Sequence, residues 1–217
     1  MKRLAVFLLA VILIVSFTAC KKPSDVRGEY EGGDPTTATQ EFDTGRVSAN
    51  KYTNQFAGIT IELGADWTFM TDEQIRQNNE AALGILDEKY EEAIKKATTF
   101  TDMMATNANG TDTVGVTFEK LTGANLLLSE QEYMNISKNS LKGALESMGM
   151  TDVTLTDGTA PFAGKNHPYI AVSAKYSGIA VYERLAVVKC GEYIVVITAC
   201  TWQTDSCKTI LDAFKVA

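Results

Sequence analysis

The stretch that decides the fold is Leu185-Ala-Val-Val-Lys-Cys-Gly-Glu-Tyr-Ile-Val-Val-Ile-Thr198. Two apolar runs flank Gly191-Glu192, which has glycine where a two-residue hairpin turn accepts it best. An antiparallel sheet with one solvated face would alternate apolar and polar residues. With this turn, however, both faces are apolar, so the hairpin is predicted to be central in a sheet that is covered on both sides. One face carries Ala186, Val188, Val195 and Ile197, and the other carries Leu185, Val187, Ile194 and Val196.

Further strands precede this hairpin in the sequence. Apolar runs and alternating apolar and polar residues, bounded by turn residues, indicate them. Asn109-Gly110 is a strong hairpin signal because both residues accept positive φ angles. Two other turns are predicted at Ala163-Gly164 and Ser177-Gly178. The predicted strands cover residues 47–55, 58–63, 101–107, 113–120, 152–156, 167–176, 179–190 and 193–200.

Helices are predicted between and after these strands. Thr71-Asp-Glu-Gln74 and Ser129-Glu-Gln-Glu132 fit the capping box that starts a helix. One or two helices follow the first box as far as about residue 97, and one helix follows the second to about 148. A closing helix is predicted over residues 204–216. The expected fold class is therefore α+β, with a mostly antiparallel sheet covered by helices on both faces, an α/β/α sandwich.

The first twenty residues predict where the protein works. A positive start and an apolar run from Leu4 to Phe17 are typical of a signal peptide, and the run is shorter than the roughly 20 residues of a membrane-spanning helix. Phe17-Thr-Ala-Cys20 resembles the lipobox of bacterial lipoproteins, with phenylalanine where leucine is usual. The resemblance implies cleavage before Cys20, whose thiol carries a diacylglyceryl group.

Three segments follow from this pattern. Residues 1–19 are the predicted signal peptide, residues 20–45 a flexible tether rich in Gly, Pro and Thr, and residues 46–217 a single globular domain.

The net charge is −7, and loss of Lys2 and Arg3 leaves 18 basic against 27 acidic residues, a net charge of −9. An acidic chain gains little from phosphate contacts, so no nucleic-acid partner is expected. Acyl chains on Cys20 are expected to hold the protein at the membrane.

No candidate chemistry in the domain has a defined motif. His167 is the single histidine and is interpreted as a loop or strand-edge residue, because no nucleophile motif accompanies it. No phosphate-binding loop, serine-hydrolase elbow or zinc motif is present, so no cofactor or metal is expected. A run of helix carboxylates is interpreted as a solvated face. It comprises Asp87, Glu88, Glu91 and Glu92.

Three cysteines remain in the domain. The register of the central hairpin separates Cys190 from Cys200 by over 20 Å at about 3.3 Å per residue, too far for a disulfide. Cys200 and Cys207 lie either side of the predicted turn into the closing helix. They are interpreted as a disulfide or as two small buried apolar residues, and the sequence leaves both open.

Three parts of the sequence resemble the PsbP-like α/β/α sandwich of the PsbP and actinobacterial LpqN-type proteins. They are Tyr52 with Gly58-Ile-Thr-Ile-Glu-Leu63 and Trp67, then Gly191 to Thr198, then Ile210-Leu-Asp-Ala-Phe214. Gly64 lies where the family usually has proline. The resemblance covers about residues 46–217. Since the family shares no catalytic residues, it implies a binding or accessory domain.

Three functions are compatible with these observations. The first is a non-enzymatic binding or accessory module for a protein or small ligand, lipid-anchored on the extracytoplasmic face of the bacterial cell membrane. The second is an extracytoplasmic enzyme, such as a hydrolase, with an unrecognised site. The third is a structural component of the cell envelope. A partner surface could use aromatic side chains along the chain, namely Tyr30, Phe162, Tyr169, Tyr176 and Tyr182.

Overall fold

The central hairpin is formed by β9 (Ile179–Cys190) and β10 (Tyr193–Trp202), in the middle of the larger of two sheets. This is seen in a computed structural model that describes residues 42–84 and 90–217. Val188 pairs with Val195, which confirms the predicted register. The predicted signal peptide, Cys20 and most of the tether lie outside the described residues.

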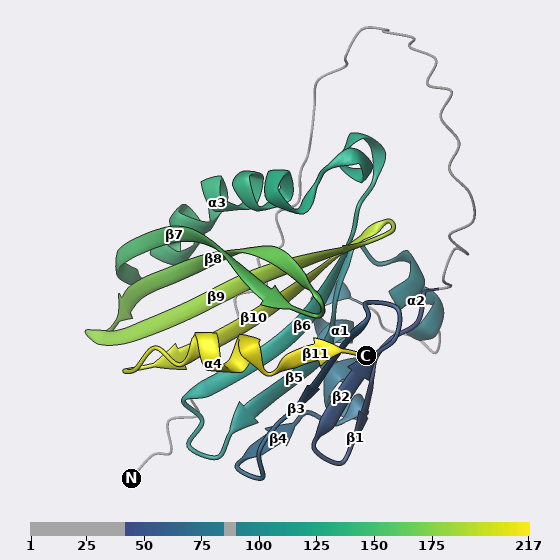
Figure 1. Cartoon of the computed structure of the whole chain (residues 1–217), viewed down its shortest axis with the longest axis horizontal. Helices are drawn as coiled ribbons and strands as arrows, with labels where there is room; N and C mark the ends of the chain where they lie inside the picture. Colours follow the sequence, from purple (N-terminus) through teal and green to yellow (C-terminus); the bar gives the residue numbers. More distant parts are fainter. Residues whose placement is uncertain (1–41, 85–89) are drawn as a thin grey trace, which may run out of the picture.

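Among the described residues, the larger sheet has seven antiparallel strands in the order β4-β5-β6-β10-β9-β8-β7. The sheet is curved, and the β7–β8 hairpin reaches across towards the C-terminal strand (Figure 1). The turns Ala163-Gly164 and Ser177-Gly178 are confirmed, and all four residues have positive φ. The outer strands are β4 (Trp67–Phe69), β5 (Thr99–Asn107), β6 (Asp112–Lys120), β7 (Met150–Phe162) and β8 (Lys165–Tyr176).

The second sheet joins the start of the domain to its end. Its order is β1-β2-β3-β11, and all its pairs are antiparallel. The predicted closing helix over 204–216 is wrong in its last part, because α4 (Cys207–Asp212) is short and a strand follows it. Phe214 pairs with Ile61, so the strand satisfies backbone groups at the edge of β3. The four strands are β1 (Arg46–Ser48), β2 (Lys51–Asn54), β3 (Ile59–Glu62) and β11 (Phe214–Val216).

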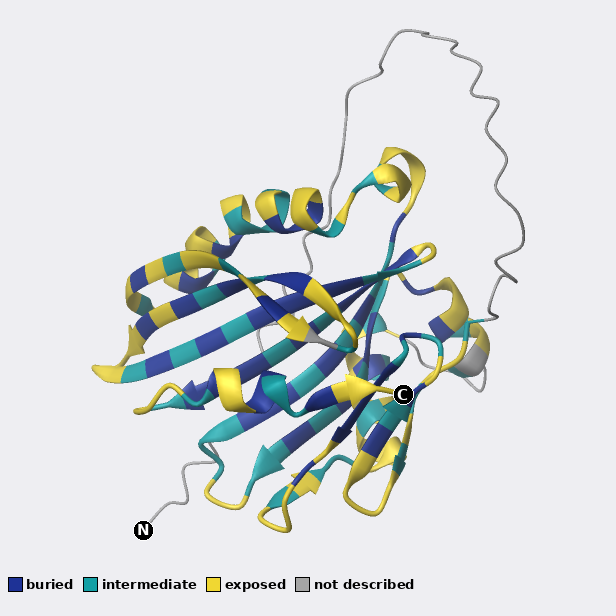
Figure 2. Ribbon diagram, in the orientation of Figure 1, coloured by how far each residue is buried: buried dark blue, intermediate teal, exposed yellow. Residues whose placement is uncertain are grey.

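The larger sheet is covered on both faces, as predicted for a hairpin with two apolar faces. Helix α3 (Glu130–Ser147) packs on one face, where Leu185, Val187 and Ile194 enter its core. The small sheet and α4 cover the other face, where Ala186 and Val195 are buried. Figure 2 shows buried positions alternating with intermediate or exposed ones along the outer strands, whereas β9 and β10 have runs of consecutive buried residues near their shared turn. The α+β class is therefore confirmed, although a second sheet shares the cover that helices were expected to provide.

The predicted helix starts are confirmed. Thr71 and Ser129 both form complete capping boxes, at the starts of α1 (Asp72–Leu83) and of α3. Gly84 ends α1 with a φ of 67°, and α2 follows over Tyr90–Lys96. A short 3₁₀ helix, η1 (Gly123–Leu127), leads into α3.

The β5–β6 hairpin is confirmed, but its turn differs from the predicted one. Only Gly110 of the Asn109-Gly110 pair has a positive φ, 70°. The loop is longer than two residues, because Asn107 Oδ1 accepts hydrogen bonds from the backbone N–H groups of Thr111 and Asp112. The side chain of Asn107 thus replaces the tight turn that the Asn-Gly pair predicts.

A buried carboxylate joins the two sheets. Asp102 lies where the register of β5 shifts against β6. It accepts hydrogen bonds from the hydroxyl of Tyr52 at 2.6 Å, the side-chain amide of Asn54 at 2.9 Å and the backbone N–H of Gly45. Burial raises the pKa of Asp102, and the three donors lower it again in part. The network fixes the small sheet against the irregular part of β5.

Candidate functional site

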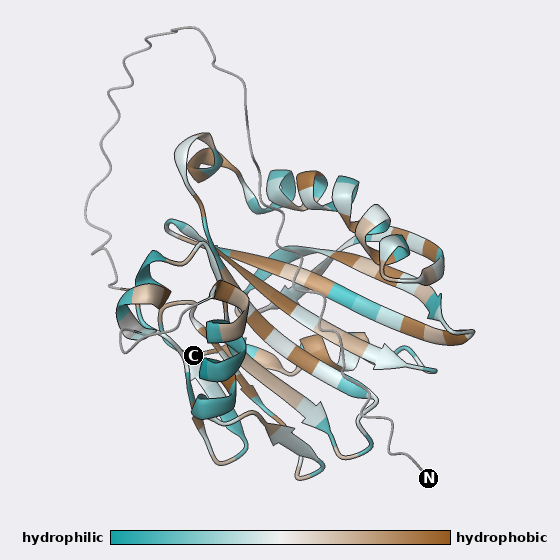
Figure 3. Ribbon diagram, turned by 180° about the vertical axis from the view of Figure 1, so that it is seen from behind, coloured by the Kyte–Doolittle hydropathy of each residue, from teal (hydrophilic) through white to brown (hydrophobic). Residues whose placement is uncertain are grey.

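A recess lies between α3 and the larger sheet, and we call it the groove. Helix α3 contacts β7, β8 and β9, and α1 contacts β5, so β10 and β6 carry less cover. Figure 3 shows this side, with α3 over one part of the sheet and uncovered strands beside it. The recess holds about 60 Å³, and its lining comprises Thr99, Met104, Thr113, Val114, Gly115, Thr117, Glu119, Tyr133, Met134, Ser137, Leu141, Ile170, Leu185, Val187, Val196, Thr198 and Cys200.

Strand alternation explains the composition of the groove floor. Along β6, Val114, Val116 and Phe118 belong to the core of the opposite face. The residues between them therefore point to the α3 side, because successive side chains of a strand alternate in direction. These are Thr113, Gly115, Thr117 and Glu119, and all four line the groove. The floor is thus rich in hydroxyl groups, while methionine, leucine and valine side chains supply its apolar surface.

Glu119 and Tyr133 form one end of the groove. The hydroxyl of Tyr133 on α3 donates a short hydrogen bond to the carboxylate of Glu119 on β6. Partial burial raises the pKa of Glu119, and this hydrogen bond lowers it. Burial and the neighbouring carboxylate also raise the pKa of Tyr133. The Glu119 carboxylate therefore has a fixed partner inside the protein.

Glu183 borders the opposite end of the groove and has no such partner. It lies on β9 directly across from Cys200, which lines the groove, and two residues before Leu185, which also lines it. The residue is 3% exposed, and its carboxyl group makes no hydrogen bond or ion pair with the described residues. Because burial penalises the charged form, the pKa of Glu183 is raised to about 7.

The single histidine lies outside the groove. His167 is buried on β8, and its Nδ1 is 3.0 Å from a carboxylate oxygen of Glu130 at the start of α3. Glu130 also accepts a hydrogen bond from the backbone N–H of Lys189 at 2.8 Å. Burial raises the pKa of Glu130, but the hydrogen bonds from His167 and the Lys189 backbone lower it by more, so the pKa lies below its ordinary value. This contact holds the start of α3 against β8 and β9. Of the two predicted positions, loop or strand edge, the loop is wrong, because His167 is a buried structural residue near the start of β8.

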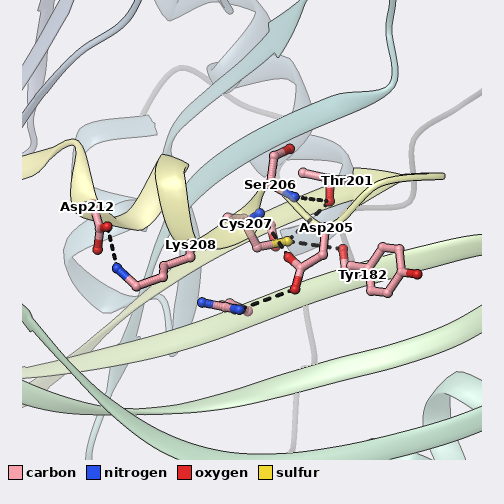
Figure 4. A network of polar contacts seen from close by, with 9 residues as sticks. Tyr182, Thr201, Asp205, Ser206, Cys207, Lys208 and Asp212 are labelled. Atoms are coloured by element: carbon pink, nitrogen blue, oxygen red, sulfur yellow. Dashed lines mark hydrogen bonds and ion pairs between the residues drawn. The ribbon is translucent and has the colours of Figure 1, made fainter.

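The three cysteines of the domain are free thiols. Cys200 faces the groove, whereas Cys207 belongs to the core on the opposite side of the sheet. A disulfide between them is thereby excluded, and the alternative of two buried thiols is confirmed. The thiol of Cys207 lies 3.3 Å from the carbonyl oxygen of Ala199 and 3.4 Å from that of Tyr182. Figure 4 shows Cys207 beside Tyr182.

The remaining predicted residues do not form one site. Tyr169 and Tyr182 pack against the core that faces α4, whereas Tyr176 contacts Trp202 on the α3 side. These three tyrosines therefore do not form one aromatic patch. Tyr30 and the carboxylates Asp87 and Glu88 lie outside the described residues.

Sequence reasoning missed Glu183, although the sequence contained a signal for it. Position 183 has the same parity along its strand as Leu185 and Val187, so it falls on a face that was predicted to be covered. A charged residue on such a face is unusual, since buried charges are normally paired. The groove itself depends on how α3 lies over the sheet, which strand alternation does not specify.

Comparisons with known proteins bear on the fold. No protein-family model and no curated protein matches the chain. The solution structure of cyanobacterial PsbP (CyanoP) from Synechocystis sp. PCC 6803 is similar, with a TM-score of 0.44 and 11% identity over 85% of this chain and 98% of that one. The crystal structure of LpqN from Mycobacterium tuberculosis, described as involved in cell envelope biogenesis, has a TM-score of 0.44 and 12% identity over 73% of this chain and 83% of that one.

Two further properties concern only the described residues. None of their helices has the length and apolar content needed to cross a membrane. Within the same residues, no three His, Cys, Asp or Glu side chains form a group that could hold a metal ion.

Proposed function

We propose that this protein is a bacterial envelope lipoprotein, anchored through lipid on Cys20, whose domain binds a small amphipathic ligand in the groove without catalysis. The groove carries the proposal. Its apolar side chains suit a hydrocarbon portion, and its threonine hydroxyls suit polar atoms along the same molecule. A ligand of this kind could come from the membrane surface or from the medium beside it.

The reactive groups of the groove support binding rather than chemistry. Cys200 is the thiol in its lining, and burial together with the nearby charge of Glu183 raises the pKa of that thiol. A thiol with a raised pKa is a poor nucleophile at neutral pH, because the thiolate is the reactive form. Glu119 is held by Tyr133, and His167 belongs to the contact with Glu130 on another side of α3.

Gly115 provides the test of groove binding. A Cβ atom added at Gly115 would meet only the carbonyl oxygen of Met103, at 3.6 Å, which is ordinary contact. The Gly115→Ile variant should therefore fold, since isoleucine also favours strands, while its side chain fills the recess. Gly143→Ala is the matched control, because Gly143 lies on the exposed side of α3 with free space around it.

The measurement is the fluorescence of the neutral dye N-phenylnaphthylamine with the full chain and both variants. Dye bound by the lipid or leader contributes equally to all three proteins and cancels in the difference. We expect Gly115→Ile to weaken the remaining binding at least about tenfold, a change of 1.4 kcal/mol, and Gly143→Ala to leave it unchanged. Equal dye binding by the wild type and Gly115→Ile would refute the groove as the site.

The anchor has a separate test. Cys20→Ser removes the thiol that the lipidation reaction needs, so the protein should no longer carry acyl chains. In the native host, metabolic labelling with a palmitate analogue should mark the wild type and not the variant. Labelling that persists in Cys20→Ser would contradict the lipoprotein assignment.

A further inference from the structure

We infer that the groove takes a cationic amphiphile, an alkylamine-like molecule whose ammonium group pairs with Glu183 at one end. This inference rests on the proposed function and names the ligand class of the same site. Its first support is the position of Glu183, which is flanked by the groove residues Cys200 and Leu185.

The second support is the missing partner of Glu183. A buried carboxylate is costly unless a cation or several hydrogen-bond donors compensate it. Asp102 and Glu130, two partly buried carboxylates discussed above, each accept hydrogen bonds from the protein. Glu183 has no comparable donor among the described residues, although its side chain is 97% covered. An ammonium group entering from the groove would supply both a positive charge and hydrogen-bond donors.

The third support is the charge of the groove. Its lining contains the carboxylate of Glu119 and no lysine, arginine or histidine. The groove therefore has carboxyl groups at both ends, in a chain with a net charge of −7. Such a surface attracts cations and repels carboxylates and phosphates. The residues between the ends are mostly apolar and suit an alkyl chain, so charge and polarity indicate the same class of ligand.

The groups facing Glu183 determine how binding should depend on pH. On β10 the facing residue is Cys200, whose thiol stays protonated, and on β8 it is Val172, which has no charge. From α3, the core residues on this face are Tyr133, Met134, Leu141 and Leu145, of which only Tyr133 titrates, with a raised pKa. Glu183 is therefore the group that changes charge near neutral pH, since its pKa is about 7.

The test uses octylamine and octanol, which share one alkyl chain and differ in the head group. Both compete with N-phenylnaphthylamine for the full chain between pH 6 and pH 8. Octylamine is a cation throughout this range, and it needs ionised Glu183. With a pKa of about 7, the ionised fraction rises from about one in eleven to about ten in eleven. The affinity for octylamine should therefore rise about tenfold with pH, whereas that for octanol should stay constant.

Two variants identify the carboxyl group responsible. Glu183→Gln should abolish the pH dependence of octylamine binding and weaken it about tenfold or more at pH 8, without changing octanol binding. Glu119→Gln makes the same chemical change at the opposite end of the groove and should leave the pH dependence in place. The wild-type pH profile needs no variant, so the inference remains testable if Glu183→Gln folds poorly.

The outcomes separate this inference from the proposed function. If octylamine and octanol bind equally at pH 8 and the dye still distinguishes the wild type from Gly115→Ile, the cationic ligand class is refuted and the groove remains. A pH dependence that disappears in Glu119→Gln instead would also overturn the assignment to Glu183. If octanol, octylamine and N-phenylnaphthylamine each bind equally to Gly115→Ile and to the wild type, the proposed function itself fails.

Discussion

The burial of Glu183 predicts a specific dependence of stability on pH in the ligand-free protein. The perturbation is Glu183→Gln, which keeps the size of the side chain and removes its titration. In the folded state the pKa of Glu183 is raised to about 7, from an ordinary value of 4.5. Since no other ionisable group is changed, the difference between the two proteins isolates this carboxyl group.

The sign follows from proton binding. Between pH 4.5 and pH 7 the folded protein keeps the proton on Glu183 while the unfolded chain loses it, so stability falls as pH rises through this window. The stabilisation that protonated Glu183 gives the folded state is fully present below about pH 4.5 and is lost above about pH 7. At 1.36 kcal/mol per pH unit, the loss is at most about 3.4 kcal/mol. Glu183→Gln lacks this loss, and its amide changes the free energy of unfolding by the same amount at every pH.

Urea denaturation of both proteins at half-unit steps from pH 4.5 to pH 8 provides the measurement. The free energy of unfolding of Glu183→Gln, relative to the wild type, should increase by about 2–3 kcal/mol across this range. Titration of the other carboxyl groups is common to both proteins and cancels. A difference that stays constant within about 0.5 kcal/mol would refute the assignment of a partnerless buried carboxyl group at this position.

The other predictions concern packing. Gly45→Ala should lower the free energy of unfolding by about 2 kcal/mol in urea denaturation, because the new Cβ atom would lie 2.2 Å from the ring of Tyr52; unchanged stability would contradict the packing. Iodoacetamide at neutral pH should leave Cys200 and Cys207 unmodified in the folded protein and alkylate both in urea, since both are buried thiols with raised pKa values; modification of either in the folded protein, read by mass spectrometry, would contradict this burial. Gly143→Ala should raise the thermal midpoint through a gain of about 0.5–1 kcal/mol, because the position is an open site inside a helix; a lower midpoint would contradict that placement.

Features set by neighbouring residues in the sequence were predictable. The central hairpin needs only a two-residue turn and two apolar runs, so its register followed once Gly191-Glu192 was taken as the turn. The capping boxes at Thr71 and Ser129 are likewise local, since each joins residues three positions apart. A sequence specifies its fold when such local preferences agree with the packing of the whole domain.

Features set by distant pairing were not predictable in the same way. Phe214 continues the helical apolar spacing of Ile210 and Leu211, yet its strand pairs with β3, which lies at the other end of the domain. The turn at Asn109-Gly110 was predicted as a tight one, but the side chain of Asn107 accepts the backbone hydrogen bonds there. In the first case a distant strand determined the structure, and in the second a side-chain acceptor next to the predicted turn did so.

The dimensions of the fold explain why a groove exists on the α3 side. Seven strands at about 4.8 Å spacing make a sheet about 29 Å wide, whereas one helix with its side chains is about 10 Å across. A single helix therefore covers two or three strands, and α3 contacts β7, β8 and β9. The other face avoids this shortage because a second sheet and α4 share its cover.

The strands that α3 does not cover have both polar and apolar residues on the α3 face of the sheet. If solvent alone were to contact β6 and β10, their exposed face would be expected to be uniformly polar. Thr113, Thr117 and Thr198 satisfy that expectation, but Met104 and Val196 on the same face do not. A face of mixed polarity, bordered by a carboxyl group that lacks a partner, is better matched to an amphipathic molecule than to water or to a second helix. The ligand would complete the cover that α3 leaves unfinished, so its binding should also stabilise the fold by an amount set by its concentration relative to its dissociation constant.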